Sequence, residues 1–280
     1  MHDLIAQLQQ MAAPRVALVG DFMLDRYVYG DVERISPEAP VPVLRSVRRE
    51  TRPGGAGNVA MAIAALGGVA QCCGVVGDDT DADALAQLLT AEGSQVDALV
   101  RTPDRPTTVK CRYVGLAQHR HAQQMFRVDE EEVAPLTASA SDQLLATLTA
   151  TLASADVLAL EDYDKGVITD VTGPAMIAAA TAAGKPVVVD PARLESYARY
   201  RGATLLTPNR YEAELVSGVT ITDEASMAAV AAAICESADA QAVVITLDKE
   251  GAYLYAGGQG RIIGTRPRSV YDVTGAGDVV

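Results

Sequence analysis

The chain has few of the side chains that build disulfides or metal centres. Its four cysteines include no Cys-x-x-Cys pair. Cys72 and Cys73 lie within an apolar stretch, which is typical of buried free thiols in a reducing cytosol. His119 and His121 have no carboxylate or thiol at a metal-ligand spacing, so the sequence predicts no side-chain metal centre there.

Long apolar runs and excess basic residues are also lacking. No segment approaches the roughly 18 uninterrupted apolar residues of a membrane span. Residues 1–11 lack the basic start and apolar run of a signal peptide. The chain has 23 basic and 36 acidic residues. The resulting formal net charge of −13 argues against nucleic acid or an anionic membrane as a bulk partner. These features predict a cytoplasmic protein that acts on small molecules.

Short apolar runs alternate with helical patterns along the 280 residues. The alternation predicts an α/β fold with a mostly parallel sheet, helices on both faces and ligands at the carboxyl ends of the strands. We expect strands at 15–20, 71–76, 156–160, 186–190, 203–207 and 242–247, and helices at 58–66, 79–91, 170–183, 210–217 and 224–237.

Two β-prone segments, 27–50 and 105–128, interrupt this alternation without a helix between their strands. Both occupy loop positions on the ligand side of the sheet. We interpret them as a small antiparallel flap, or lid, that excludes water during the reaction. Ordinary surface hairpins are the alternative.

The last residues combine an anion nest with a carboxylate. Gly275, Ala276 and Gly277 allow backbone N–H groups to converge on an anion, because no large side chain blocks the approach. Asp278 follows directly, which favours a role in accepting the proton of a hydroxyl that attacks a phosphoryl group.

Two motifs lie near the expected start of the fold. Asp21 and Asp25 follow the first strand, where carboxylates suit sugar hydroxyls or cap a turn. Gly54, Gly55 and Asn58 open a helix and either let a ligand approach the backbone or form a flexible loop. No Gly-x-Gly-x-x-Gly follows the first strand, which disfavours a dinucleotide-binding fold.

Three further motifs follow later strands. The segment 161–166 carries three carboxylates and a lysine, which suit either a surface near substrate or metal, or a solvated acidic loop. Asn209 and Glu212 at a helix start suit a hydrated Mg²⁺, and the same spacing forms a capping box. The segment 246–251 either lines a nucleotide or forms a hairpin.

Taken in order, Gly54-Gly55 to Asn58, Asn209-x-x-Glu212 and the segment 272–278 resemble the motifs of the ribokinase-like (PfkB) carbohydrate kinases. The resemblance covers nearly the whole chain. It implies a three-layer α/β/α sandwich with a mostly parallel central sheet and a small β lid. It also implies a single kinase domain over residues 1–280, with lid segments at about 27–50 and 105–128 and further helices after residue 280.

Within this family, segments 20–27, 34–42, 162–166 and 200–209 resemble the kinases of D-glycero-β-D-manno-heptose 7-phosphate. The resemblance implies ATP-dependent phosphorylation of the anomeric C1 hydroxyl, which gives heptose 1,7-bisphosphate for ADP-heptose and lipopolysaccharide core synthesis. It also implies a homodimer that pairs through its lids and a fused nucleotidyltransferase domain. The alternatives are another PfkB sugar or nucleoside kinase, and a non-catalytic sugar-phosphate-binding fragment.

The resemblance also implies roles for individual residues. Asp278 would be the base, and Gly275, Ala276 and Gly277 the anion hole for the γ-phosphate. The sugar would be held by Asp25, Gly54, Gly55, Asn58 and Glu161. The nucleotide would be bordered by Asn209, Glu212, Thr246, Asp248 and Gly251, with Asn209 and Glu212 organising Mg²⁺ through water. A monovalent cation would be positioned by Asp272 and Thr274.

The phosphate of such a sugar needs a basic clamp, and guanidinium groups pair well with phosphate oxygens. Of the basic residues in or near the lid and the strand ends, the sequence favours Arg34 and Arg127. The full set of candidates is Arg34, Arg112, Arg120, Arg127, Lys165 and Arg193.

Overall fold

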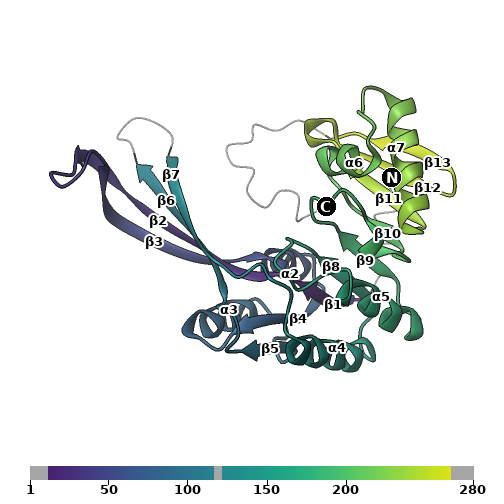
Figure 1. The fold of residues 1–280 in the computed structure, drawn as a ribbon, viewed down its shortest axis with the longest axis horizontal. Coiled ribbons are helices and arrows are strands. Elements are labelled where there is room, and N and C mark those ends of the chain that lie inside the picture. The colour runs from purple at the N-terminus through teal and green to yellow at the C-terminus, as the bar shows by residue number, and fades with distance from the viewer. Residues whose placement is uncertain (1–11, 117–121, 266–280) are drawn as a thin grey trace.

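The polypeptide forms two β-sheets in the computed structural model, which describes residues 12–116 and 122–265 (Figure 1). The strands of the larger sheet are β1 (Arg15–Gly20), β4 (Val69–Gly77), β5 (Leu99–Thr102), β8 (Val157–Glu161), β9 (Val187–Asp190), β10 (Leu205–Leu206), β11 (Ala242–Thr246), β12 (Ala252–Ala256) and β13 (Gln259–Ile263). Their order is β13-β12-β11-β10-β9-β8-β1-β4-β5. Neighbours are parallel except at β11–β12 and β12–β13.

Helices pack on both faces of the larger sheet. The described helices are α2 (Ala56–Ala65), α3 (Thr80–Ala91), α4 (Ala138–Leu152), α5 (Thr172–Ala182), α6 (Arg210–Ser217) and α7 (Glu224–Ala238), with short 3₁₀ turns η1 (Ala198–Tyr200) and η2 (Asp248–Glu250). One core cluster unites α4, α5 and α7 with the sheet, and a second unites α2 and α3 with it. The layered α/β fold class predicted from the sequence is therefore confirmed.

Strand β1 shows why the sheet is covered on both sides. Its residues Arg15-Val-Ala-Leu-Val-Gly20 are buried after the first position. Ala17 and Val19 belong to the core cluster that includes α4 and α5, whereas Val16 and Leu18 belong to the cluster that includes α2 and α3. Because successive side chains of a strand point to opposite faces, a continuous apolar run fits a central parallel strand.

The smaller sheet is the lid. It consists of β2 (Phe22–Ile35), β3 (Pro42–Gly55), β6 (Thr108–Leu116) and β7 (Gln123–Glu130), in the order β3-β2-β6-β7. Figure 1 shows it projecting away from the larger sheet. The expected purely antiparallel arrangement is wrong, because β2 and β6 pair in parallel. The chain passes through α2, β4, α3 and β5 between β3 and β6, so β6 enters the lid in the same direction as β2.

Lid strands β2 and β3 extend deeper into the molecule than the sequence indicates. Phe22 and Leu24 of β2 and Val109 of β6 are buried in the core cluster around α2 and α3. The segment 27–50 therefore covers only the projecting part of β2 and β3, whereas the segment 105–128 already includes all of β6 and stops two residues before the end of β7. The roots of the lid are anchored by apolar burial.

The predicted strands and helices of the large sheet are confirmed with small shifts at their ends. Asp79 is the N-cap of α3 rather than its first residue, because its side chain accepts a hydrogen bond of 2.8 Å from the Ala82 N–H. Helix α2 begins at Ala56, two residues before the predicted start. Cys72 and Cys73 are buried free thiols, as expected, whereas Cys111 and Cys235 are partly exposed.

Three elements have no counterpart among the elements expected from the sequence: α4, β5 and β13. Strand β12 is the second strand of the hairpin considered for the segment 246–251. Helix α4 is rich in serine, threonine and alanine, which weakens its apolar pattern. Leu144, Leu148 and Leu152 nevertheless recur at intervals of four and are buried. No helix among the described residues is long and apolar enough to cross a membrane.

The loop after β8 is locked against the loop that follows β7. Gly166 has φ +83°, and a Cβ atom at this position would lie 2.1 Å from the Ala134 carbonyl oxygen. The Gly166 carbonyl accepts a hydrogen bond of 3.2 Å from the Leu136 N–H. Only glycine satisfies both the left-handed backbone and this close approach.

Gly166→Ala should therefore destabilise the fold more than an alanine at an open left-handed position. Gly93 is the matched control, because its φ is +87° and nothing lies within 4 Å of its would-be Cβ. We expect about 1–2 kcal/mol of lost unfolding free energy for Gly93→Ala and about 1–3 kcal/mol more for Gly166→Ala. Denaturant unfolding measures both; equal losses would contradict the steric assignment.

Candidate active site

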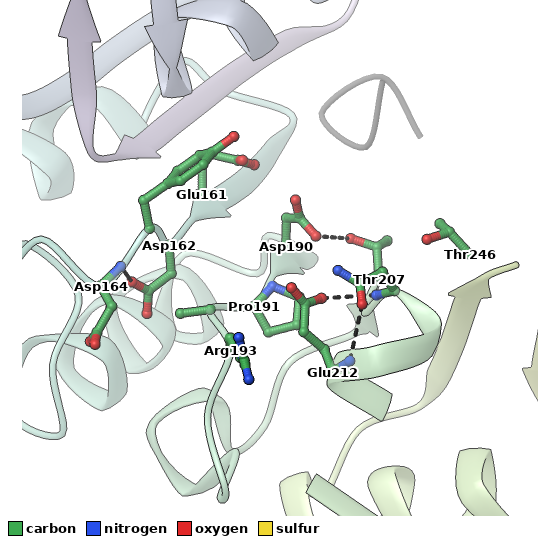
Figure 2. Close-up of a pocket in the computed structure, with 12 residues that line it drawn as sticks. Glu161, Asp162, Asp164, Asp190, Pro191, Arg193, Thr207, Glu212 and Thr246 are labelled. Atoms are coloured by element: carbon green, nitrogen blue, oxygen red, sulfur yellow. Dashed lines mark hydrogen bonds between the residues drawn. The ribbon is translucent and has the colours of Figure 1, made fainter. Parts of the chain in front are cut away.

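A cavity of about 430 Å³ opens at the carboxyl ends of β8, β9 and β11 and at the start of α6 (Figure 2). This is the edge at which parallel α/β sheets bind ligands. The residues that line it come from four connections that follow strands. They are Glu161, Asp162, Tyr163, Asp164, Asp190, Pro191, Ala192, Arg193, Thr207, Asn209, Glu212 and Thr246.

The cavity lining is acidic. Five of its residues are carboxylic acids and only Arg193 is basic. The Arg193 guanidinium lies 4.2 Å from the Tyr211 ring centroid and donates a hydrogen bond to the Tyr211 hydroxyl. A bare phosphate would be repelled by such a lining, whereas phosphates that carry a divalent cation would fit it.

Asn209 and Glu212 form a reciprocal capping box at the start of α6. The Glu212 N–H donates to Asn209 Oδ1 at 3.0 Å, and the Asn209 N–H donates to Glu212 Oε2 at 2.9 Å. Burial raises the pKa of Glu212, and the hydrogen bonds from Asn209 oppose that shift. The capping interpretation is thus realised, and both side chains still line the cavity.

Two threonines complete this side of the cavity. Thr207 Oγ1 donates a hydrogen bond of 3.0 Å to Asp190 Oδ1, as Figure 2 shows. Thr246 ends β11 and its N–H donates to the Pro208 carbonyl at 3.0 Å. These contacts join the ends of β9, β10 and β11 into one wall.

A buried Asp162 organises the opposite wall. Its Oδ2 accepts hydrogen bonds from the Tyr200 hydroxyl at 2.6 Å and from Arg199 at 3.3 Å. Burial raises the pKa of Asp162, while Tyr200 and Arg199 counter the shift. The Tyr200 hydroxyl also accepts from the Ala192 N–H at 3.0 Å, which fixes the segment beside Arg193. The sequence analysis missed Arg199 and Tyr200 because they contact the site from 37 and 38 positions away.

Asp21 connects the cavity with the lid. Its Oδ2 accepts hydrogen bonds from the Tyr163 N–H at 2.8 Å and the Lys165 N–H at 3.2 Å. Its backbone N–H donates to the Glu161 carbonyl, and its carbonyl accepts from the Ala56 N–H, both at 3.2 Å. Asp21 is 3% exposed, and its Oδ1 has no partner among the described residues. Burial, reinforced by the charge of Asp162, raises the pKa of Asp21 to about 7.

Three of the predicted sugar-binding residues, Asp25, Gly54 and Gly55, lie where β2 and β3 leave the core. A Cβ at Gly54 would lie 2.8 Å from the Asp25 carboxyl carbon, so the glycine lets the carboxylate pack against the backbone. Gly55 has φ +53° and approaches the Asp21 carbonyl too closely for a side chain. Asn58 lies in the first turn of α2 and lines a separate groove with Met61, Ala62, Ala64, Ala65 and Glu92.

Of the remaining predicted residues, Glu161 and Thr246 line the cavity, but Asp248 and Gly251 do not. Asp248 is exposed in η2, and Gly251 closes the turn into β12. These two residues thus realise the hairpin interpretation of the segment 246–251. The closing motif, with Asp272, Thr274, Gly275, Ala276, Gly277 and Asp278, lies outside the described residues, as does Arg120.

The basic candidates in the lid differ in their positions. Arg127 forms two hydrogen bonds with Asp129, at 2.7 and 2.8 Å, and Arg112 pairs with Asp25. Arg34 is exposed near the far end of β2. At about 3.3 Å per residue, it lies roughly 30 Å along the strand from Asp25, so one sugar cannot contact both residues within a chain.

The arrangement of oxygen, nitrogen and sulfur ligands decides how a metal ion could bind. Within residues 12–116 and 122–265, no group of three or more His, Cys, Asp or Glu side chains is arranged to hold a metal ion. The acidic cavity nevertheless offers oxygen atoms, including the Asn209 and Glu212 side chains. This fits a Mg²⁺ that keeps its water ligands and is shared with a nucleotide.

The raised pKa of Asp21 has a consequence for stability. A folded pKa of about 7 lies above the ordinary value of 3.8, so the stability from this group is present below about pH 4 and lost as pH rises through 7. We expect Asp21→Asn to gain stability relative to the wild type between pH 4 and 8, by up to about 4 kcal/mol.

Urea unfolding at several pH values measures this difference. Asp142→Asn, at an exposed position of α4, is the matched control and should differ from the wild type by a constant amount. A pH-independent difference for Asp21→Asn would show that Asp21 does not titrate as described.

Proteins of similar sequence include two that are named as bifunctional. The chain is 44% identical over 283 residues to the bifunctional protein HldE of Caulobacter sp. (strain K31), covering 100% of this chain and 56% of the relative. It is 46% identical over 268 residues to the bifunctional protein HldE of Shewanella amazonensis, covering 95% and 54%. The chain thus spans about half the length of these curated relatives.

Solved structures share the fold. The ribokinase of Arabidopsis thaliana, complexed with ribose and ATP, superposes with a TM-score of 0.70 at 20% identity, covering 96% of this chain and 83% of that one. The tetrameric inhibited form of phosphofructokinase-2 from Escherichia coli superposes with a TM-score of 0.77 at 23% identity, covering 96% and 84%. These likenesses establish a ribokinase-like fold.

Residues 13–280 match the sequence model of the family described as pfkB family carbohydrate kinase. That range includes the cavity, the lid and the closing motif. Together with the relatives above 40% identity, the match shows that this chain belongs to the pfkB family of carbohydrate kinases.

Proposed function

We propose that this carbohydrate kinase transfers the γ-phosphoryl group of ATP to the anomeric C1 hydroxyl of D-glycero-β-D-manno-heptose 7-phosphate. One observation carries the proposal. Residues of two segments that resemble the heptose-7-phosphate kinases, 162–166 and 200–209, line the cavity, and a third, 20–27, contacts the first of them through Asp21. Asp21 holds the loop 162–166, Tyr200 holds Asp162, and Thr207 and Asn209 line the wall. The 44% and 46% identity of the chain to the relatives named bifunctional protein HldE adds support.

The chemistry follows from the expected roles of the chain's residues. Asp25, Gly54, Gly55, Asn58 and Glu161 would hold the sugar. Asp278 would accept the proton of the C1 hydroxyl. The oxygen of that hydroxyl would form a bond to the γ-phosphorus while the bond between the γ-phosphorus and ADP breaks.

The anion hole of Gly275, Ala276 and Gly277 would receive the γ-phosphoryl oxygens through backbone N–H groups. Such a reaction depends on positioning and charge stabilisation more than on covalent catalysis.

The nucleotide would occupy the acidic cavity beside Asn209, Glu212 and Thr246, with Asp248 and Gly251 farther along the same edge. Asn209 and Glu212 would bind the water ligands of Mg²⁺, which supplies positive charge against the phosphates when bound. Asp272 and Thr274 would position a monovalent cation.

We further propose that the protein is cytoplasmic and forms a homodimer through its lids. Exposed apolar side chains on one face of the lid support the pairing. Phe126 and Val128 are 50% and 43% exposed, and the Phe126 ring stacks on Tyr113 with centroids 4.5 Å apart. The relatives are named bifunctional, so the kinase would account for one of two activities, and a fused nucleotidyltransferase domain would supply the other.

A sugar panel tests the proposed substrate. With ATP and Mg²⁺, coupled ADP release should give the highest kcat/KM for heptose 7-phosphate. Fructose 6-phosphate, ribose and unphosphorylated heptose should be poorer substrates. A higher kcat/KM for fructose 6-phosphate or ribose would favour a different pfkB kinase. Sugar-phosphate binding without any nucleotide binding, measured by calorimetry, would favour a non-catalytic module.

The base assignment predicts the effect of Asp278→Asn. The amide cannot accept the hydroxyl proton, so kcat should fall by about 10²–10⁴-fold. The Kd for heptose 7-phosphate, measured by calorimetry, should change little because the sugar contacts lie elsewhere. Near-normal turnover in this variant would assign the base to another residue.

A further inference from the structure

The face of the lid that carries Asp25 also carries most of its cations. Register places Lys110 of β6 opposite Asp25 and Asp129, and Arg112 opposite Tyr27 and Arg127. Because side chains alternate along a strand, these residues share one face. We call Asp25, Tyr27, Lys110, Arg112, Arg127 and Asp129 the cationic lid face.

Ion pairs account for the carboxylates around this face, including Glu50 opposite Tyr27, which pairs with Arg48 and Arg52. Asp25 pairs with Arg112, and Asp129 pairs with Arg127 at 2.7 Å. Glu131, just after β7, pairs with Lys165 at 2.9 Å.

Lys110 is the cation left over. Among the described residues, it has no carboxylate within ion-pair distance. In a chain with a formal net charge of −13, an unpaired positive charge at this position needs an explanation.

Burial and the neighbouring cations Lys165 and Arg127 oppose the charge of Lys110, while Asp25, Glu131 and the Tyr163 ring support it. The Lys110 Nζ lies 5.2 Å from the centroid of the Tyr163 ring, and Tyr163 lines the cavity. Burial lowers the pKa of Lys110, and the nearby charge of Lys165 lowers it further. A bound anion would favour the charged form of Lys110.

An acceptor lies beside these cations. Glu131 uses Oε1 to pair with Lys165, while its Oε2 is buried with no hydrogen-bond partner among residues 12–116 and 122–265. A buried carboxylate oxygen without a donor is unfavourable. A hydroxyl next to a bound phosphate would satisfy it.

We propose that Lys110 and Lys165 bind the terminal phosphate ester of the sugar substrate, and that Glu131 Oε2 accepts a hydrogen bond from a neighbouring hydroxyl. This subsite rests on the proposed function only in requiring a sugar phosphate held beside Asp25. Lys110 takes the role that the sequence favours for Arg34, because Lys110 is opposite Asp25 whereas Arg34 lies far along β2. Arg127 borders the subsite through its pair with Asp129.

Steady-state kinetics of Lys110→Gln test the subsite. Loss of one charged hydrogen bond to phosphate should raise the KM for heptose 7-phosphate by about 10- to 100-fold. The kcat and the KM for ATP should stay within about threefold, because Lys110 touches neither the nucleotide nor the C1 hydroxyl. Lys110→Arg should recover part of the loss, because it keeps the charge.

The matched control is Arg261→Gln. Arg261 is exposed in β13, outside the lid and outside the face that the proposed dimer would use. Its KM for the sugar phosphate should equal that of the wild type. Thermal unfolding shows whether Lys110→Gln is folded. If it is not, Lys110→Met, which retains the apolar stem, serves as the second variant.

Three results would overturn the subsite. The first is an unchanged KM for the sugar phosphate in folded Lys110→Gln. The second is an equal rise in KM for heptose 7-phosphate and unphosphorylated heptose. The third is a rise in the KM for ATP alone, which would assign Lys110 to the nucleotide.

The proposed substrate can fail separately. If the wild type prefers another sugar phosphate in the panel, the same comparison with that compound and its unphosphorylated sugar decides the role of Lys110. The heptose assignment is then wrong. The phosphate subsite is supported only if Lys110→Gln raises the KM for that sugar phosphate more than the KM for its unphosphorylated sugar.

Discussion

The site depends on one buried carboxylate, that of Asp21, at the end of the central strand β1. Its backbone and side chain bind three segments at once: the end of β8, the loop that carries Tyr163 and Lys165, and the start of α2 at Ala56. Those segments carry the acidic cavity, one lysine of the proposed phosphate subsite and the glycines behind Asp25. Because a buried acid is most stable when its acceptors are used, hydrogen bonding at Asp21 favours a single arrangement of all three.

The resulting site has two regions of opposite charge. The cavity at the strand ends is lined by carboxylates, which suits phosphates that arrive with a divalent cation. The cationic lid face has a surplus lysine, which suits a phosphate that arrives without one. A kinase for a sugar phosphate must bind the nucleotide phosphates and the sugar phosphate at different places. The difference in charge between the cavity and the lid face would direct each phosphate to its own region.

Local patterns predicted the parts of the fold that local physics decides. The apolar run of β1, the cap of α3 at Asp79 and the capping box of Asn209 and Glu212 each follow from a few neighbouring residues. Contacts between distant segments were not accessible in the same way. The parallel pairing of β2 with β6 depends on how the chain returns to the lid, and it alone places Lys110 opposite Asp25. An alternating Lys110-x-Arg112 pattern on a predicted strand was the one signal that could have drawn attention to that face.

The proposed reaction is phosphoryl transfer to the anomeric oxygen of a sugar that already carries a phosphate. The most direct measurement is ³¹P NMR of the product formed from ATP and heptose 7-phosphate. We expect a new phosphate resonance coupled to the anomeric proton, with the original phosphate resonance retained. A new phosphate coupled to any other ring or side-chain proton, or no phosphorylated product at all, would contradict transfer to C1.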